Sequence, residues 1–266
     1  MWLSDIAVVI KAHRRPYYLE PVLQSWAQAR GLQQVSRFAV CLDRGDRHER
    51  MLQVIADVQK ARYLKRYPPF EVVHDSPAAV ASPGMHRGLG EALDLAFTNP
   101  HVRFAVVGEE DILVSDDILE YMRWAAGQFA RDPRVLAVCG HNRGGQGWDV
   151  HRPSDDGDAS QLGVQLLPYF NAWGWGTWRD CWEQILRPEW DWDGTSGGPL
   201  DSGWDWNIAV RIRPRHGAVC VVPDASRTQN IGFSEGYYST PESFAFSQAR
   251  SFRLHRASTS YVLGAQ

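Results

Sequence analysis

The sequence predicts an α/β fold in which a mainly parallel sheet carries helices on both faces. In the first half of the chain, short apolar runs rich in β-branched residues alternate with segments of helical spacing. Buried strands joined by helices of this length form right-handed crossovers in a parallel sheet. The 266 residues are enough for one such unit, and we expect a single domain over 1–266.

The elements of the first half follow one another in a clear order. Apolar runs predict strands at residues 6–12, 38–43, 70–73, 104–108 and 135–139. Apolar residues at helical spacing predict helices between them, at residues 19–29, 46–67, 89–97 and 115–129. Asp46 and Ser115 are expected to cap the second and the fourth of these helices, because short polar side chains bind free amides at a helix start.

The second half has a less regular pattern. Gly- and Asp-rich stretches predict loops at 141–163 and 188–203, with short helices at 179–186 and 204–213. A last strand is expected at 218–222, followed by a polar, lid-like segment at 225–242. Long loops in compact domains are often functional or mobile. We therefore expect an irregular C-terminal region with mobile loops.

Composition narrows the class of protein. The net charge is -3 and no basic arm is present, which argues against nucleic acid as a partner. The longest early apolar stretch, Ile6–Ile10, is too short for a signal peptide or a membrane span, so we expect a cytoplasmic protein with no membrane span. The four cysteines show no paired metal spacing and are expected to be free thiols.

The most informative segment is the acidic triplet Glu109, Glu110 and Asp111, which directly follows the strand expected at 104–108. Ligands of parallel α/β sheets bind beyond the carboxyl ends of the strands, where Asp43 is also expected. Adjacent carboxylates raise each other's pKa unless a cation neutralises them, and a hard divalent ion does this while also accepting phosphate oxygens. The alternative is a solvated acidic turn before a helix.

Tryptophan is unusually abundant, with twelve residues, most of them after Trp124. Indole rings stack on the apolar faces of sugars, and their N–H groups donate hydrogen bonds. The same residues can equally fill an aromatic core. Composition alone favours the core.

Several short motifs, taken in order, resemble those of GT-A glycosyltransferases. They resemble in particular the inverting N-acetylglucosaminyltransferases that act on mannose. They also resemble bacterial glycosyltransferase-like proteins that carry a Trp-Gly-Trp-(Gly/Ala)-Thr-Trp signature and an Asn-Ile-Gly-Phe segment. The matching segments are residues 8–14, 41–43, 85–87, 109–111, 169–178, 203–206 and 223–228. The triplet departs from the N-acetylglucosaminyltransferases at Glu110, where they carry Asp, and residues 229–233 are closer to the bacterial proteins.

The resemblance implies a GT-A, Rossmann-like fold. Residues 1–140 would bind a nucleotide-sugar, and residues 141–266 would hold the acceptor and the catalytic base. The implied donor is a UDP-sugar, carrying N-acetylglucosamine or another hexose. The implied acceptor is a hydroxyl group on a glycan, a lipid-linked sugar, a peptide or a small molecule. The implied cofactor is Mn²⁺ or Mg²⁺.

The resemblance also implies roles for single residues in the first half. Asp111 would ligate the metal, and Glu109 and Glu110 would contact the ribose, the sugar or metal-bound water. Arg14 would contact the nucleotide, Asp43 the uracil, and His86 would close over the base. Arg14 could equally be a surface arginine, Asp43 a turn residue and His86 a solvated histidine.

In the second half, Trp175 would shape the sugar site and Arg227 would balance the charge of the diphosphate. Asp205 would be the general base of a one-step inverting transfer. The Trp-rich region offers further carboxylates for that role, and the resemblance alone selects among Asp191, Asp193, Asp201 and Asp205.

Two other functions are compatible with parts of the sequence. A sugar-1-phosphate nucleotidyltransferase would usually carry a Gly-rich loop after the first strand, and residues 11–16 contain no glycine. A Trp-rich carbohydrate-binding protein without activity would bind sugar but would depend on neither UDP nor manganese.

Overall fold

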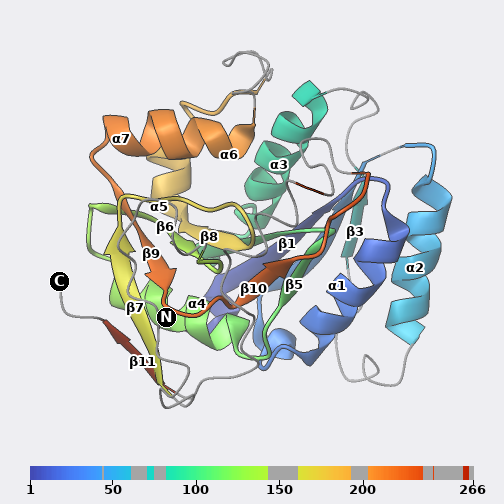
Figure 1. Cartoon of the computed structure of the whole chain (residues 1–266), viewed down its shortest axis with the longest axis horizontal. Coiled ribbons are helices and arrows are strands. Elements are labelled where there is room, and N and C mark those ends of the chain that lie inside the picture. Colours follow the sequence, from blue (N-terminus) through green and yellow to red (C-terminus); the bar gives the residue numbers. More distant parts are fainter. Residues whose placement is uncertain are drawn as a thin grey trace.

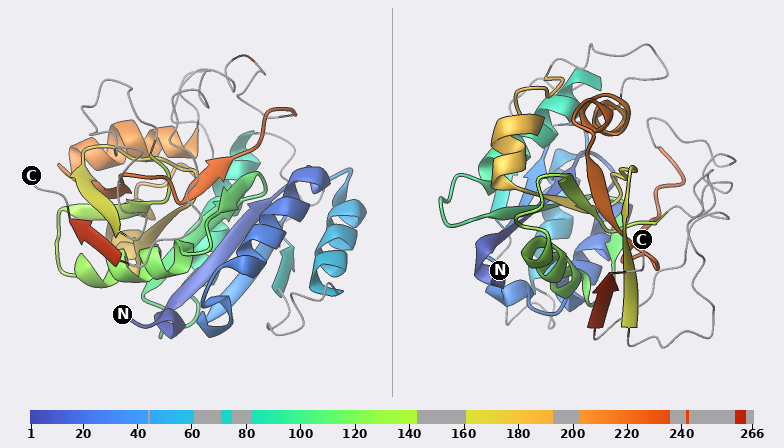
Figure 2. Two further views of the ribbon diagram at one scale, coloured as in Figure 1. Left: turned by 60° about the horizontal axis from the view of Figure 1, so that its bottom comes forward. Right: turned by 90° about the vertical axis from the view of Figure 1, so that its left-hand side faces the viewer.

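The computed structural model describes residues 1–43, 45–60, 71–74, 82–142, 161–192, 203–235, 242 and 260–263 (Figure 1). Within these ranges, nine strands form one sheet in the order β11-β7-β9-β6-β8-β4-β1-β2-β3, and β10 and β5 form a separate pair. Helices cover both faces of the large sheet (Figures 1 and 2). The fold is therefore α/β, as the alternating pattern predicts.

The N-terminal part is a parallel unit whose order in space is β4-β1-β2-β3. Its strands are β1 (Ile6–Ala12), β2 (Arg37–Leu42), β3 (Glu71–His74) and β4 (Phe104–Glu109). Its helices are α1 (Pro16–Gln28), α2 (His48–Lys60) and α3 (Ser82–Ala96). These elements confirm the predicted order. The predicted continuation of the second helix beyond Lys60 lies outside the described residues.

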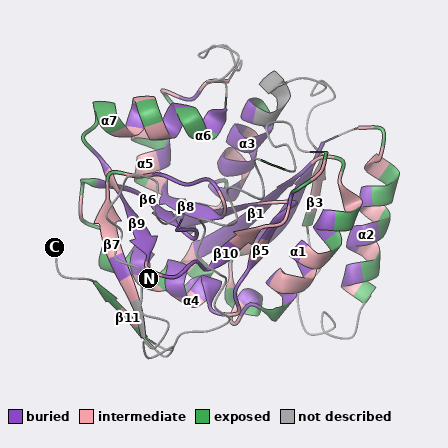
Figure 3. Cartoon of the chain, viewed as in Figure 1, coloured by how far each residue is buried: buried purple, intermediate pink, exposed green. Residues whose placement is uncertain are grey.

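Alternate residues of β1 enter two different apolar cores, which is why the whole strand is apolar up to Lys11. Ile6, Val8 and Ile10 pack with residues of α1, α2 and α4 (Ile118–Gln128). Ala7 and Val9 pack with residues of α3 and of two π-helical segments, η4 (Trp182–Leu186) and η5 (Asn207–Ile212). Figure 3 shows the resulting buried layer along the central strands.

The second half extends the sheet more than the sequence predicts. β6 (Val135–Cys139) and β9 (Val219–Pro223) match predicted strands and are parallel to each other. β8 (Trp175–Trp178) lies antiparallel between β4 and β6, in the Trp- and Gly-containing segment for which the sequence predicts no strand. Two more unpredicted strands, β7 (Gln161–Leu167) and β11 (Ser260–Leu263), close that side of the sheet.

Two helical stretches pack on the α3 side of the sheet. α5 (Arg179–Cys181) continues into η4, and α6 (Trp204–Trp206) continues through η5 into α7 (Arg213–Arg215). Both stretches agree with the short helices predicted from the sequence. No helix within the described ranges combines the length and the apolar character needed to cross a bilayer.

The pair β5 (Ile112–Val114) and β10 (Thr228–Asn230) lies directly after the carboxyl end of β4. Its register places Asn230 opposite Ile112, so the residues after β10 meet the acidic triplet. The predicted helix cap at Ser115 is wrong, because α4 begins at Ile118 and the Ser115 hydroxyl instead donates to Asp117 Oδ1 at 2.6 Å. Asp46 also precedes the observed helix start at His48 by two residues.

Candidate active site

Functional side chains gather where β1, β2 and β4 end at the same edge of the sheet. The register pairs Lys11 of β1 with Glu109 of β4, and Ala12 with Leu42 of β2. Asp43 follows directly, and its backbone N–H donates to the Ala12 carbonyl at 3.0 Å. The sheet therefore brings the acidic triplet and Asp43 to one edge, as the strand positions predict.

A guanidinium bridges two members of the triplet. Arg15 Nε donates to Glu110 Oε1 at 2.6 Å, and Arg15 Nη2 lies 2.9 Å from Asp111 Oδ2. Glu110 also accepts the backbone N–H of His13 at 2.5 Å. Arg15 is partly buried, which by itself would lower its pKa, but the charges of Asp111 and Glu110 outweigh this cost and raise it. Arg15 thus supplies one positive charge to a cluster of three carboxyl groups.

Glu109 links the triplet to the second half of the chain. Burial raises the pKa of Glu109 well above its usual range, and the charges of Asp111 and Asp205 raise it further. Burial also raises the pKa of Asp111, although Arg15 opposes the shift. Asp205 itself is exposed in the first turn of α6. The predicted base and the triplet are therefore close enough to interact electrostatically.

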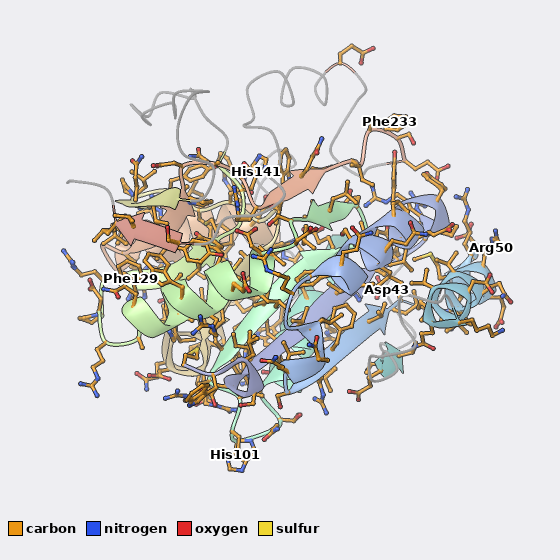
Figure 4. The ribbon with its side chains drawn as sticks, turned by 90° about the horizontal axis from the view of Figure 1, so that it is seen from below. Asp43, Arg50, His101, Phe129, His141 and Phe233 are labelled. Atoms are coloured by element: carbon orange, nitrogen blue, oxygen red, sulfur yellow. The ribbon has the colours of Figure 1, made fainter. Side chains whose placement is uncertain are left out.

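The chain after β10 covers Asp111. Ile231 N–H donates to the Asp111 carbonyl at 2.8 Å, and a Cβ added at Gly232 would lie only 2.1 Å from Asp111 Oδ2. Glycine is therefore required where this backbone crosses the carboxylate. Phe233 is exposed, and Figure 4 shows it projecting from the side of the molecule opposite to His101, which precedes β4.

Asp43 is buried and is contacted by two side chains from the end of β1. Lys11 Nζ lies 2.5 Å from Asp43 Oδ1, and His13 Nδ1 lies 3.2 Å from Asp43 Oδ2. Burial alone would raise the pKa of this carboxyl, but hydrogen bonds and charges from His13 and Lys11 hold it below its usual value. Asp43 is thus an ionised acceptor at the sheet edge.

His86 and Asp191 meet on the α3 side of the site. His86 is fully buried on α3, and its Nδ1 lies 3.7 Å from Asp191 Oδ2. Trp190 donates its indole N–H to the His86 carbonyl at 2.9 Å. Asp191 is therefore a buried neighbour of His86, whereas Asp205 is exposed. The other two candidate bases, Asp193 and Asp201, lie outside the described residues.

Two predicted site residues are not brought to this edge. Arg227 is 1% exposed, and its Nη1 pairs with Asp117 Oδ2 at 3.0 Å inside the core, so its guanidinium does not face a diphosphate. Trp175 is fully buried and stacks on Trp204 at 5.7 Å, so it fills the core and offers no free ring face to a sugar. Burial of the Trp175 ring stabilises the fold. Asp117 compensates the buried charge of Arg227.

The neighbouring residues Arg14 and Arg15 have different surroundings. Arg14, the predicted nucleotide contact, is exposed, whereas Arg15 grips Glu110 and Asp111. Sequence analysis also missed Lys11 and His13. A detectable signal existed for Lys11, because a charged residue in an otherwise apolar, buried strand is rarely tolerated without a partner.

Comparison with known proteins supports the same fold. Residues 1–248 match the GNT-I family. TarS from S. aureus, as residues 1–349, is 13% identical and gives a TM-score of 0.53 over 91% of this chain and 62% of that chain. In its complex with UDP the TM-score is 0.37 at 13% identity, over 54% of this chain and 37% of that chain.

A mannosyltransferase from Pyrobaculum calidifontis, solved in complex with GDP-Man and Mn²⁺, is 16% identical with a TM-score of 0.45. The match covers 68% of this chain and 46% of that chain. The chain thus spans less than two thirds of each of these structures. The TarS superposition shows a GT-A-like glycosyltransferase fold, and the match over residues 1–248 shows that the chain belongs to the GNT-I family.

Proposed function

We propose that the chain is a metal-dependent glycosyltransferase that moves a sugar from a UDP-sugar to a hydroxyl acceptor with inversion at the anomeric carbon. The observation that carries the proposal is the carboxylate triplet at the end of β4, with Asp43 at the same edge of the sheet and Asp205 near enough to affect the pKa of Glu109. Family membership supports glycosyl transfer as the reaction. N-acetylglucosamine and other hexoses are the donor sugars to test.

We assign Asp111 as the ligand of Mn²⁺ or Mg²⁺. Among the described residues, no three His, Cys, Asp or Glu side chains form a complete metal cage. The triplet nevertheless gathers three carboxyl groups around the single guanidinium of Arg15, which suits a cation held by one or two of them and otherwise by phosphate and water. Such an ion, when bound, stabilises the charge that develops on a departing diphosphate.

The nucleoside would lie at the ends of β1 and β2. Asp43 would accept the N3–H of uracil, and His86 with its neighbour Trp190 would close the α3 side. Arg14 is exposed and is proposed as a further contact with the nucleotide. Glu109 and Glu110 would contact the ribose, the sugar or water on the metal. Arg15 would keep Glu110 and Asp111 in place.

Asp205 is the proposed general base. Asp205 is exposed at the first turn of α6, and its charge raises the pKa of Glu109. An acceptor hydroxyl can therefore reach this carboxylate from solvent, close to the triplet. A single base that removes the hydroxyl proton fits a one-step displacement through an oxocarbenium-like transition state. Asp191 fits the role less well, because its side chain is only 7% exposed and faces His86.

A donor-hydrolysis screen tests the proposal. UDP-, GDP- and dTDP-sugars are incubated with the protein in Mn²⁺ and in a chelator, and the same samples are melted with and without UDP. We expect Mn²⁺-dependent hydrolysis of a UDP-sugar and a rise in Tm with UDP, since ligand at about 100 times its Kd adds about 2.7 kcal/mol to stability. Both effects should disappear in Asp111→Asn and remain in Asp57→Asn, an exposed substitution on α2.

An inactive carbohydrate-binding protein would give the opposite result. It would bind glycans with no response to UDP or Mn²⁺, and Asp111→Asn would behave like the control. Trp26, Trp175 and Trp182 do not support this alternative, because they are at most 1% exposed and pack in the core.

A further inference from the structure

Lys11 is a buried charge in the central strand of the N-terminal unit. The other residues of β1 are buried and apolar, and Lys11 itself is 6% exposed. Moving an ammonium group out of water is costly, and a well-packed apolar residue at such a position is often at least as stabilising. A lysine here is therefore poorly explained by stability alone, and its partner indicates what it does.

The partner is Asp43, which Lys11 and His13 hold from two directions. Lys11 Nζ contacts Oδ1 at 2.5 Å and His13 Nδ1 contacts Oδ2 at 3.2 Å. The Asp43 backbone is also fixed, since its N–H donates to Ala12 and its carbonyl oxygen lies 3.1 Å from His48 Nδ1. The carboxylate therefore has one defined orientation at the sheet edge.

We propose that Lys11 is a positioning residue of the nucleotide site, which with His13 keeps Asp43 ionised and oriented to accept the N3–H of uracil. The inference rests on the proposed UDP-sugar donor. It explains how Asp43 would distinguish uracil from cytosine. An ionised carboxylate only accepts hydrogen bonds, whereas a protonated one also carries an O–H donor. Uracil offers a hydrogen-bond donor at N3, whereas cytosine offers an acceptor there. An ionised Asp43 therefore binds uracil in preference to cytosine, and a protonated Asp43 discriminates between the two bases less.

The electrostatic environment explains why Lys11 is needed. Burial disfavours the charged form of Asp43, and the hydrogen bonds and charges of His13 and Lys11 bring its pKa below the usual value. Cys41 lies on β2, two residues before Asp43. Burial raises the pKa of its thiol to about 11, so this side chain carries no charge at physiological pH. His48 faces the Asp43 carbonyl. Without Lys11, less would oppose the effect of burial, and Asp43 would protonate at a higher pH.

Calorimetric titration with UDP and CDP between about pH 5 and pH 8 tests this role. Wild type should prefer UDP with little pH dependence. Lys11→Met should bind UDP about tenfold more weakly, because Asp43 would no longer be held to accept a charge-assisted hydrogen bond from uracil N3–H. The UDP affinity of this variant should fall further as the pH decreases and Asp43 protonates. Lys11→Arg should keep the preference for UDP. Lys60→Met, which removes an exposed lysine at the end of α2, should match wild type.

The double variant Lys11→Met/Asp43→Asn covers the case in which Lys11→Met does not fold. It removes both buried charges together, and it should melt as a folded protein yet bind UDP weakly at every pH. Wild-type UDP affinity in a folded Lys11→Met protein or in the double variant overturns the inference and leaves the proposed function standing. A wild-type protein that prefers CDP or GDP to UDP, or binds none of them, overturns the inference together with its proposed donor.

Discussion

Replacing Arg15 with Met should strongly destabilise the protein, whereas replacing its neighbour Arg14 should not. Arg15 is 13% exposed on its side chain and forms charge-assisted contacts with Glu110 and Asp111 at 2.6 and 2.9 Å. Removing one partner of a buried ion pair costs about 3–5 kcal/mol, because the remaining charge is left uncompensated. That is a large part of the ~5–15 kcal/mol that stabilises a typical domain.

The measurement is urea unfolding of wild type, Arg15→Met and Arg14→Met in metal-free buffer. Arg14 is exposed, and a surface substitution of this kind usually changes stability by less than about 0.5 kcal/mol. Equal free energies of unfolding for the two variants would refute the assignment of Arg15 as the buried counter-charge. Added Mn²⁺ should recover part of the loss in Arg15→Met, because it supplies the missing positive charge.

The pH dependence of this loss has a defined sign. The pKa values of Glu109 and Asp111 are raised in the folded protein, so the folded state holds these protons more tightly than the unfolded state. Stability from these groups is therefore highest at low pH and declines as the pH rises above the ordinary carboxyl value of about 4. Arg15→Met raises both pKa values further, so its destabilisation should be largest near neutrality and should shrink toward about pH 4.

Three further outcomes are expected. Asp205→Asn should lower kcat by about 10²–10⁴-fold with little change in the UDP-induced rise in Tm, since it removes only the base. Gly232→Ala should reduce Mn²⁺-dependent donor hydrolysis, because its Cβ would lie 2.1 Å from Asp111 Oδ2 and must displace the backbone or the carboxylate. Arg227→Met should cost about 3–5 kcal/mol in urea unfolding, because the fully buried charge of Asp117 would lose its positively charged partner.

The N-terminal half of the fold could be predicted because its signals are local. β1, β2 and β4 are continuous apolar runs, and the helices between them have apolar faces at helical spacing. β8 gave no such signal, because it is short and rich in Gly and Trp. It is a strand because β4 and β6 bind its two edges, and Gly176 leaves room for Phe104, whose ring would lie 2.4 Å from an added Cβ.

The position of the candidate site could be predicted from the sequence, but the side chains that contact its carboxylates could not all be predicted. The place of Asp43 and of the triplet at the strand ends follows from strand boundaries alone, and the structure confirms it. Which of Arg14 and Arg15 contacts the triplet depends on which side chain turns toward β4 after the end of β1. Adjacent side chains leave an extended segment in different directions. Sequence alone gives no means of making that choice.

By itself, the sequence determined the order of the first strands and helices and the edge of the sheet at which carboxylates collect, since both depend on residues close together in the chain. Only the tertiary structure decided which groups meet there. Arg15 and Glu110 are 95 residues apart, and Arg227 and Asp117 are 110 apart. Such contacts depend on crossovers and strand insertions that no local pattern encodes, so one arginine joined the acidic triplet and another was buried in the core.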